Sequence, residues 1–397
     1  MDTATIVEVG ATSNDQSNVT AEELIESYNL LNDYVFVEPF DMDEYIESQS
    51  GGAESAGLGG GDDTTNTNPR FGLSIDGGGM RGLMPAIWLK ELERQLHEAG
   101  ETRPLSQVFS FIGGTSIGGI LAMGLAKGIK IDDLINIFQE HGKEVFHKNW
   151  YSLGGIVDVK YDSKPLFDLL ESKQNFGKSQ MQHLDGRVMV TSCTTKGTPF
   201  EFCNTTLEQK YYSVAEVCRC TSAAPTYFSG MKIENDIVED QVYVDGGMWM
   251  NNPSTIVARK IVLELQNGSY NKDKLLVLSL GTGLEPVDKL AKNTTVLGAG
   301  KIISTLMKSN MLGTDHTMKS FLGENYVRVQ VKLKENIDLA DCSPKALEQL
   351  NVAAGNKLEN GKYVFDRTTG AGKFVYEKIA DFVKKYISLK PKDTLQN

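Results

Sequence analysis

Residues 71–123 read FGLSIDGGGMRGLMPAIWLKELERQLHEAGETRPLSQVFSFIGGTSIGGILAM. Apolar runs at 71–75 and 108–112 have the composition of buried strands, and the segments 83–96 and 117–126 have the apolar spacing of helices. Short connections in this β-α-β-α order predict a parallel sheet with helices on both faces, which is an α/β fold.

The rest of the chain continues this pattern. Further strands are predicted at 188–192, 241–244, 275–280 and 326–331, and helices at 256–266 and near 371–387. No second boundary rich in glycine or proline interrupts the chain after residue 71. We therefore expect residues 71–397 to form one domain that ends in the helix near 371–387.

The N-terminal segment differs in charge. Residues 1–69 hold 15 Asp and Glu and no Lys or Arg, so the rest of the chain has 37 acidic residues (52 minus 15) against 40 basic ones. We expect residues 1–70 to be an acidic, largely disordered tail with a short amphipathic helix near 20–34, opened by a capping box at Thr20–Glu23. The helix either docks on the body or serves as a regulatory or partner-binding segment.

Charge and targeting signals limit the partners and the compartment. The residues after the N-terminal segment have a net charge near zero, so they can approach an anionic lipid surface. They show no cluster of basic residues of the kind that binds nucleic acid. The sequence shows no signal peptide and no apolar run that could span a bilayer, and its five cysteines follow no disulfide or zinc spacing. We expect a cytoplasmic protein that contacts membranes peripherally, or one exported without a signal peptide.

One serine lies where a catalytic nucleophile is expected. Gly114-Thr115-Ser116-Ile117-Gly118 connects an apolar strand pattern to an apolar helix, the setting of a nucleophile elbow. Gly114 and Gly118 allow the close backbone approach that such an elbow requires. The alternative is a tight turn whose serine caps the following helix.

A glycine-rich loop precedes this serine. Gly77, Gly78 and Gly79 follow the first strand, and their N–H groups could bind a developing oxyanion. Together with Gly82 they also match a dinucleotide-binding fingerprint. That fold needs an acidic residue near the end of the second strand, and this chain has the serine elbow there instead.

A serine needs a base to take its proton. Asp245 ends an apolar strand and precedes two glycines, so it is predicted at a carboxyl edge of the sheet, where it could act as this base. The alternative is that its side chain only closes an Asx turn at the end of the strand. As a base, Asp245 could act directly on Ser116 or through His316 in a Ser116/Asp245/His316 triad. His316 is the only histidine after Asp245.

The joint pattern resembles the patatin-like phospholipase family, which carries an Asp-Gly-Gly-Gly-x-Arg-Gly loop, a Gly-x-Ser-x-Gly elbow and an Asp-Gly-Gly segment in this order. Other stretches look like the same family: Ala223–Phe228, Asn251–Pro253, Leu278–Gly283 and Asn325–Gln330. The resemblance implies a three-layer α/β/α fold and a Ser–Asp dyad without histidine, with Ser116 as nucleophile and Asp245 as base. Gly77, Gly78 and Gly79 would form the oxyanion hole, supported by Arg81, Gly82, Gly114, Gly118, Gly246 and Gly247.

The function that follows is hydrolysis of acyl esters of membrane phospholipids or galactolipids, without metal or cofactor, under control of an activator that acts through the acidic tail. Two alternatives stay open, a carboxylesterase with the His316 triad and a catalytically silent lipid-binding protein. An acyl groove or a membrane contact could be formed by the segment 150–156 and by Met307, Met311 and Met318. An ordinary packed loop and a capped core helix are the favoured interpretation of these two features.

Overall fold

The computed structural model describes residues 68–146, 159–234, 236, 240–264, 272–286 and 299–390. Nearly all of the predicted acidic tail and the whole of segment 150–156 lie outside these residues. Residues 62–397 form one compact unit.

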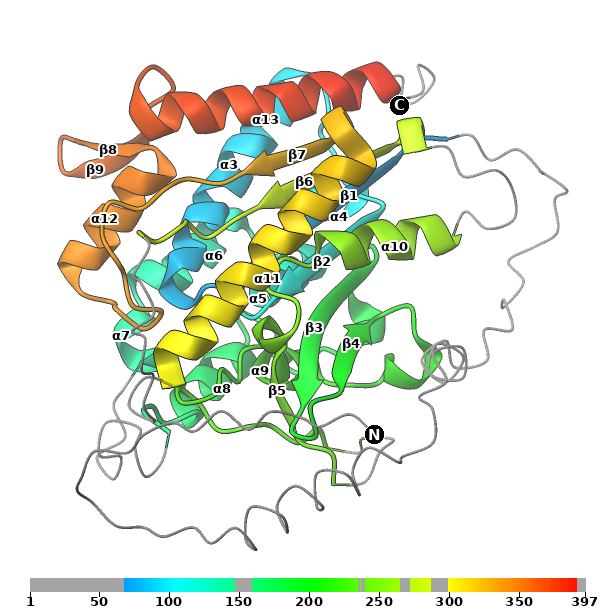
Figure 1. Cartoon of the computed structure of the whole chain (residues 1–397), viewed down its shortest axis with the longest axis vertical. Helices are drawn as coiled ribbons and strands as arrows, with labels where there is room; N and C mark the ends of the chain where they lie inside the picture. The colour runs from blue at the N-terminus through cyan, green and yellow to red at the C-terminus, as the bar shows by residue number, and fades with distance from the viewer. Residues whose placement is uncertain are drawn as a thin grey trace, which may run out of the picture. The chain divides into compact units, whose positions relative to one another are not determined.

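A mainly parallel sheet is the centre of this unit (Figure 1). Its strand order is β4-β3-β2-β1-β6-β7, with β5 paired to β3, and only β4 and β5 run antiparallel to their neighbour. The strands are β1 (Arg70–Ile75), β2 (Phe111–Thr115), β3 (Val188–Thr194), β4 (Pro199–Cys203), β5 (Tyr243–Asp245), β6 (Leu275–Leu280) and β7 (Tyr326–Val329). A separate hairpin consists of β8 (Asn356–Glu359) and β9 (Lys362–Phe365).

Helices cover both faces of the sheet, which confirms the predicted three-layer α/β/α fold. The first face packs against α3 (Leu83–Glu98), α5 (Ile117–Lys127), α9 (Val214–Thr221) and α13 (Gly370–Leu389), and the second against α10 (Ser254–Glu264) and α11 (Ala299–Leu322). The other α-helices are α4 (Leu105–Val108), α6 (Ile131–Gln139), α7 (Gly142–Val145), α8 (Lys164–Glu171) and α12 (Pro344–Ala354).

The alternation of side chains along the strands explains the two apolar layers. Val188 and Val190 of β3 enter the larger core cluster, whereas Met189 between them packs on the opposite face with Val257 of α10. Neither cluster can form without helices on its own face of the sheet. Among the described residues, none of the helices has the length and apolar character needed to cross a membrane.

One predicted strand is wrong in its position. The run expected at 108–112 ends a short helix at Val108, and β2 begins only at Phe111 and continues through Gly113 and Gly114. Parallel pairing with both β1 and β3 outweighs the low strand propensity of glycine. A side chain at Gly113 would also lie 2.4 Å from the Val257 side chain, so the packing of α10 requires glycine in this strand.

Candidate active site

Ser116 lies on a strained turn between β2 and α5. Its backbone φ is 55° and ψ is −124°, a conformation that non-glycine residues rarely adopt. A Cβ at Gly114 would lie 2.2 Å from the Gly118 carbonyl oxygen, and a Cβ at Gly118 would lie 2.3 Å from that of Ile75. The two motif glycines are therefore required sterically. The Ser116 N–H donates to Thr221 Oγ1 at 2.9 Å, so this hydroxyl supports the turn.

The sheet brings Asp245 to this serine. Asp245 ends β5, which pairs with β3, and β3 lies beside the strand that leads into Ser116. The Ser116 hydroxyl lies close enough to the Asp245 carboxylate to lower its pKa, and both residues line the same pocket. The Gly247 N–H donates to Asp245 Oδ1 at 2.7 Å. Both side chains are buried, with Asp245 2% exposed.

Burial sets the acidity of this carboxyl group. It raises the pKa of Asp245 from 3.8 to about 6, against the opposing effects of the Ser116 and Gly247 hydrogen bonds and the positive charge of Arg219. A carboxylate with this pKa is ionised at neutral pH and still accepts a proton more readily than an exposed aspartate. The arrangement can therefore accept the proton of the Ser116 hydroxyl.

The glycine loop offers two N–H donors to the site rather than three. The Gly77 N–H donates to the Asn251 carbonyl at 3.1 Å, so the expectation that Gly77 contributes to an oxyanion hole is wrong for its N–H group. Gly78 and Gly79 line the same pocket as Ser116. At Gly79 φ is +54° and a Cβ would lie 2.2 Å from the Leu339 carbonyl oxygen, so only glycine fits there.

The peptide between Gly77 and Gly78 is held in one orientation. Its carbonyl oxygen accepts from Thr282 Oγ1 at 2.7 Å and from Asn251 Nδ2 at 3.4 Å. Because a trans peptide is planar, the Gly78 N–H points opposite to this carbonyl and away from Thr282. Thr282 and Asn251 thereby orient the first candidate oxyanion donor.

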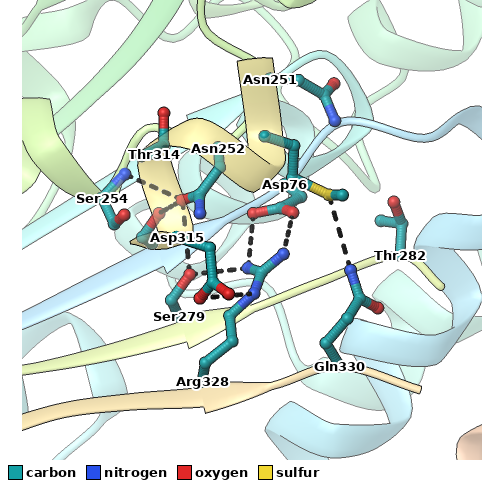
Figure 2. A network of polar contacts seen from close by, with 12 residues as sticks. Asp76, Asn251, Asn252, Ser254, Ser279, Thr282, Thr314, Asp315, Arg328 and Gln330 are labelled. Carbon is teal, nitrogen blue, oxygen red and sulfur yellow. Dashed lines mark hydrogen bonds and ion pairs between the residues drawn. The ribbon is translucent and has the colours of Figure 1, made fainter. Parts of the chain in front are cut away.

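A buried ion pair anchors the start of the same loop (Figure 2). Arg328 of β7 donates from Nη1 to Asp76 Oδ1 at 2.8 Å and from Nη2 to Oδ2 at 2.5 Å, and Nη1 also donates to Ser279 Oγ at 2.7 Å. Burial raises the pKa of Asp76, and Arg328 opposes that rise. The Asp76 N–H donates to the Leu280 carbonyl at 2.9 Å. The loop is thus fixed to both β6 and β7.

Sequence reasoning assigned no role to Thr282, Asn251 or Arg328. All three lie in stretches that carry the family resemblance, Leu278–Gly283, Asn251–Pro253 and Asn325–Gln330. Their place in these stretches is the sequence signal by which they could have been identified. Their positions next to the loop depend on strands and turns far apart in sequence, which motif spacing does not reveal.

The supporting residues have distinct structural roles. Arg81 Nη1 pairs with Glu285 Oε1 at 2.9 Å, and both residues line a neighbouring pocket rather than the Ser116 pocket. A Cβ at Gly82 would lie 2.6 Å from the Ile117 side chain, and one at Gly246 would lie 2.2 Å from Thr191 Oγ1. These glycines allow the loop, the elbow and the end of β5 to approach one another closely.

His316 is not part of the Ser116 site. It is exposed on α11, nine residues after Met307, which lines the Ser116 pocket. Nine residues of α-helix correspond to about 13 Å of rise. Ser116 and Asp245 already lie together in the same pocket without it. The structure therefore does not bring together the residues of the alternative triad.

An apolar pocket opens beside Ser116 and Asp245. Its wall comes mainly from α5, α6, α8 and the segments around them: Ile117, Ile120, Ile137, Phe138, Val145, Phe146, Leu166, Leu169, Leu170, Tyr227 and Phe228. Of the three methionines considered for an acyl groove, Met307 lines this pocket. Met318 packs instead in the core beneath α11, and Met311 lines a different pocket. The apolar wall suits a hydrocarbon chain.

Within the residues that the structure describes, no group of three or more His, Cys, Asp or Glu side chains could hold a metal ion. The polar groups that line the pocket include the side chains of Ser116, Asp245, Ser222 and Tyr227 and the backbone of Gly78 and Gly79.

Comparison with known proteins places this site in a family. The family model described as patatin-like phospholipase matches residues 73–258. Patatin-07 of Solanum tuberosum is 29% identical over 324 residues, which cover 72% of this chain and 82% of that protein. The cGAMP-activated phospholipase of Pseudomonas aeruginosa is 28% identical over 313 residues, which cover 75% and 88%. VipD from Legionella pneumophila, a solved structure, aligns with a TM-score of 0.43 and 13% identity over 80% of this chain and 67% of that chain. This chain belongs to the patatin-like phospholipase family.

Proposed function

We propose that this protein is a serine acyl hydrolase that cleaves acyl esters of membrane glycerolipids. The observation that carries the proposal is that the strained Ser116 and the buried Asp245 lie together in one apolar pocket, with Ser116 close enough to act on the pKa of Asp245. In this proposal the acyl chain enters along the apolar wall of this pocket, with the ester carbonyl at Ser116 Oγ. A phospholipase among the relatives supports the choice of substrate class.

The reaction proceeds in two steps. Ser116 Oγ attacks the ester carbonyl carbon while Asp245 accepts the hydroxyl proton, and the N–H groups of Gly78 and Gly79 stabilise the oxyanion. Collapse of this intermediate expels the lysolipid alkoxide, which takes the proton from Asp245. Water then attacks the acyl-enzyme with Asp245 as base, the fatty acid leaves, and Ser116 recovers its proton.

Two further features belong to the proposal. The enzyme acts at the membrane surface as a peripheral protein, because its substrates reside there. A small molecule activates it, as the name of the cGAMP-activated relative suggests, and the acidic segment of residues 1–69 takes part in this control or in partner binding. Neither feature enters the chemical steps above.

The test is release of free fatty acid from mixed vesicles of phosphatidylcholine and phosphatidylethanolamine, with a parallel galactolipid arm. The assay is run without and with added cGAMP, and we expect release by the wild type in at least one of these two arms and none by Ser116→Ala in either. Full activity in Ser116→Ala contradicts the mechanism. No release from either lipid class, with the activator present, favours a silent lipid-binding protein instead.

A further inference from the structure

Arg219 is a buried arginine beside the wall of the Ser116 pocket. It lies on α9, is 2% exposed, and donates from Nη2 to the Ser229 carbonyl oxygen at 2.7 Å. Its guanidinium carbon lies 5.3 Å from the centre of the Phe228 ring, and Phe228 lines the Ser116 pocket. Its Nη1 is buried and has no hydrogen-bond partner among the described residues. The side chain is therefore held in place with one of its donor groups unused.

The positive charge of Arg219 has no counter-ion in direct contact. Within the described ranges, its side chain contacts the Ser229 carbonyl and the Phe228 ring, and no carboxylate pairs with it. Arg328, which is also buried, instead binds Asp76 through both Nη atoms. Burial lowers the pKa of Arg219 to about 10, so the guanidinium is still charged at neutral pH. A buried charge without an ion pair is destabilising, so its presence needs an explanation.

Backbone contacts place Arg219 next to the strand that carries Asp245. The Asp245 N–H donates at 3.0 Å to the carbonyl of Ala223, just after the end of α9. Met231 and Tyr243 exchange backbone hydrogen bonds of 2.9 and 2.8 Å, which joins β5 to the segment that Arg219 binds. Arg219 therefore connects the two chain segments that flank the end of β5.

The other titratable groups around α9 and β5 do not neutralise this charge. Burial raises the pKa of four of them, which are therefore neutral at physiological pH: Cys193, Cys218, Cys220 and Tyr243. The Glu216 carboxylate accepts from a backbone N–H at 3.0 Å, and Asp236 accepts from the Tyr243 hydroxyl at 2.8 Å. Asp245 and Arg219 act on each other: the cation lowers the pKa of the acid, and the acid raises that of the cation.

We propose that Arg219 is a positioning residue for the reaction: its buried charge keeps Asp245 in the ionised form that accepts the Ser116 proton, and its contacts support the pocket wall at Phe228. This inference rests on the proposed hydrolase function. Arg219 does not line the Ser116 pocket, so it acts through Asp245 and not on the substrate. Its positive charge offsets part of the cost of burying an ionised carboxylate.

Three variants separate charge from packing. Arg219→Met removes the charge and keeps a long unbranched side chain. Arg219→Lys keeps the charge, because lysine, whose ordinary pKa is about two units below that of arginine, is still protonated near pH 6 after the same lowering by burial. Arg259→Met is the matched control, since Arg259 lies half exposed on α10 and pairs with Glu201.

The first readout is the pH profile of kcat/KM for fatty acid release between about pH 4.5 and about pH 8.5. We expect Arg219→Met to raise the midpoint by at least about half a pH unit, so that kcat/KM falls roughly threefold at about pH 5 relative to its value at about pH 8. Arg219→Lys and Arg259→Met should keep the wild-type midpoint. A lower rate with an unchanged midpoint in Arg219→Met would show a purely structural role and overturn the proposal.

The second readout needs no ester hydrolysis, so failure of this inference and failure of the proposed function are distinguishable. Urea unfolding at about pH 7.5 measures the effect of Asp245→Asn in the wild-type and Arg219→Met backgrounds. We expect Asp245→Asn to stabilise the Arg219→Met protein more than the wild type, because ionised Asp245 has then lost its favourable charge partner. Equal or smaller stabilisation contradicts the inference. Arg219→Gln must change both readouts in the same direction, and it takes the place of Arg219→Met if that variant does not fold.

Discussion

Asp245→Asn tests the electrostatics of the site because it separates activity from stability. Burial raises the pKa of this carboxyl group from 3.8 to about 6, so the folded protein holds its proton more tightly than the unfolded chain does. Between these two pH values the folded protein loses stability as pH rises, and the loss is complete above about pH 6. A rise of about two pH units at roughly 1.4 kcal/mol each corresponds to about 3 kcal/mol.

Asparagine is neutral and has nearly the same shape, and its side-chain carbonyl can still accept from the Gly247 N–H. We therefore expect Asp245→Asn to abolish ester hydrolysis and to raise the free energy of unfolding by about 3 kcal/mol at about pH 7.5, a gain that disappears near pH 4. Urea unfolding followed by circular dichroism at both pH values measures this difference. Asp133→Asn, at an exposed position of α6, is the control and should change stability little. Equal or lower stability of Asp245→Asn at about pH 7.5 would refute the reasoning.

Three further predictions follow from the same geometry. Because Asp245 acts as base only when ionised and burial raises its pKa to about 6, kcat/KM should rise about tenfold from pH 5 to pH 7, and a flat profile over this range contradicts that role. Thr282→Val removes the hydroxyl that orients the Gly77–Gly78 peptide, so kcat should fall roughly tenfold with KM nearly unchanged. Thr282→Ser keeps the hydroxyl and should keep the wild-type rate. A loss of similar size in both variants would show that packing around Thr282, rather than its hydroxyl, supports the rate. His316→Ala, on the exposed side of α11, should keep its rate within about twofold of wild type in the fatty acid assay, whereas a collapse would revive the triad.

Much of the fold could be predicted from the sequence because its strands are continuous apolar runs. The segment 275–280 was predicted with its observed bounds, and α5 and α13 were predicted to within a few residues. Local patterns failed where a long-range contact decides the structure. β2 passes through two glycines because β1 and β3 pair with it on both sides, and the β8–β9 hairpin carries no turn signal that we used.

In the site, too, local motifs predict some residues and long-range contacts determine the others. Motif spacing identified Ser116 and Asp245 as candidates, and the structure brings them together in one pocket. Motif spacing did not reveal that the Asn251 carbonyl accepts a hydrogen bond from the Gly77 N–H. This bond leaves two glycines rather than three as candidate oxyanion donors. Motif spacing also did not reveal that Arg328 anchors Asp76 from a strand about 250 residues later. Such partners are selected by sheet order, which single motifs do not encode.

The most direct test of the account is covalent labelling of the intact protein with a fluorophosphonate probe, followed by peptide mass mapping. This probe reacts with serines that a base activates, so it reports the nucleophile without knowledge of the lipid substrate. The account predicts one adduct, on the peptide that contains Ser116, slowed in Asp245→Asn and absent in Ser116→Ala. Labelling at another serine, or equal labelling of Ser116→Ala, would contradict it.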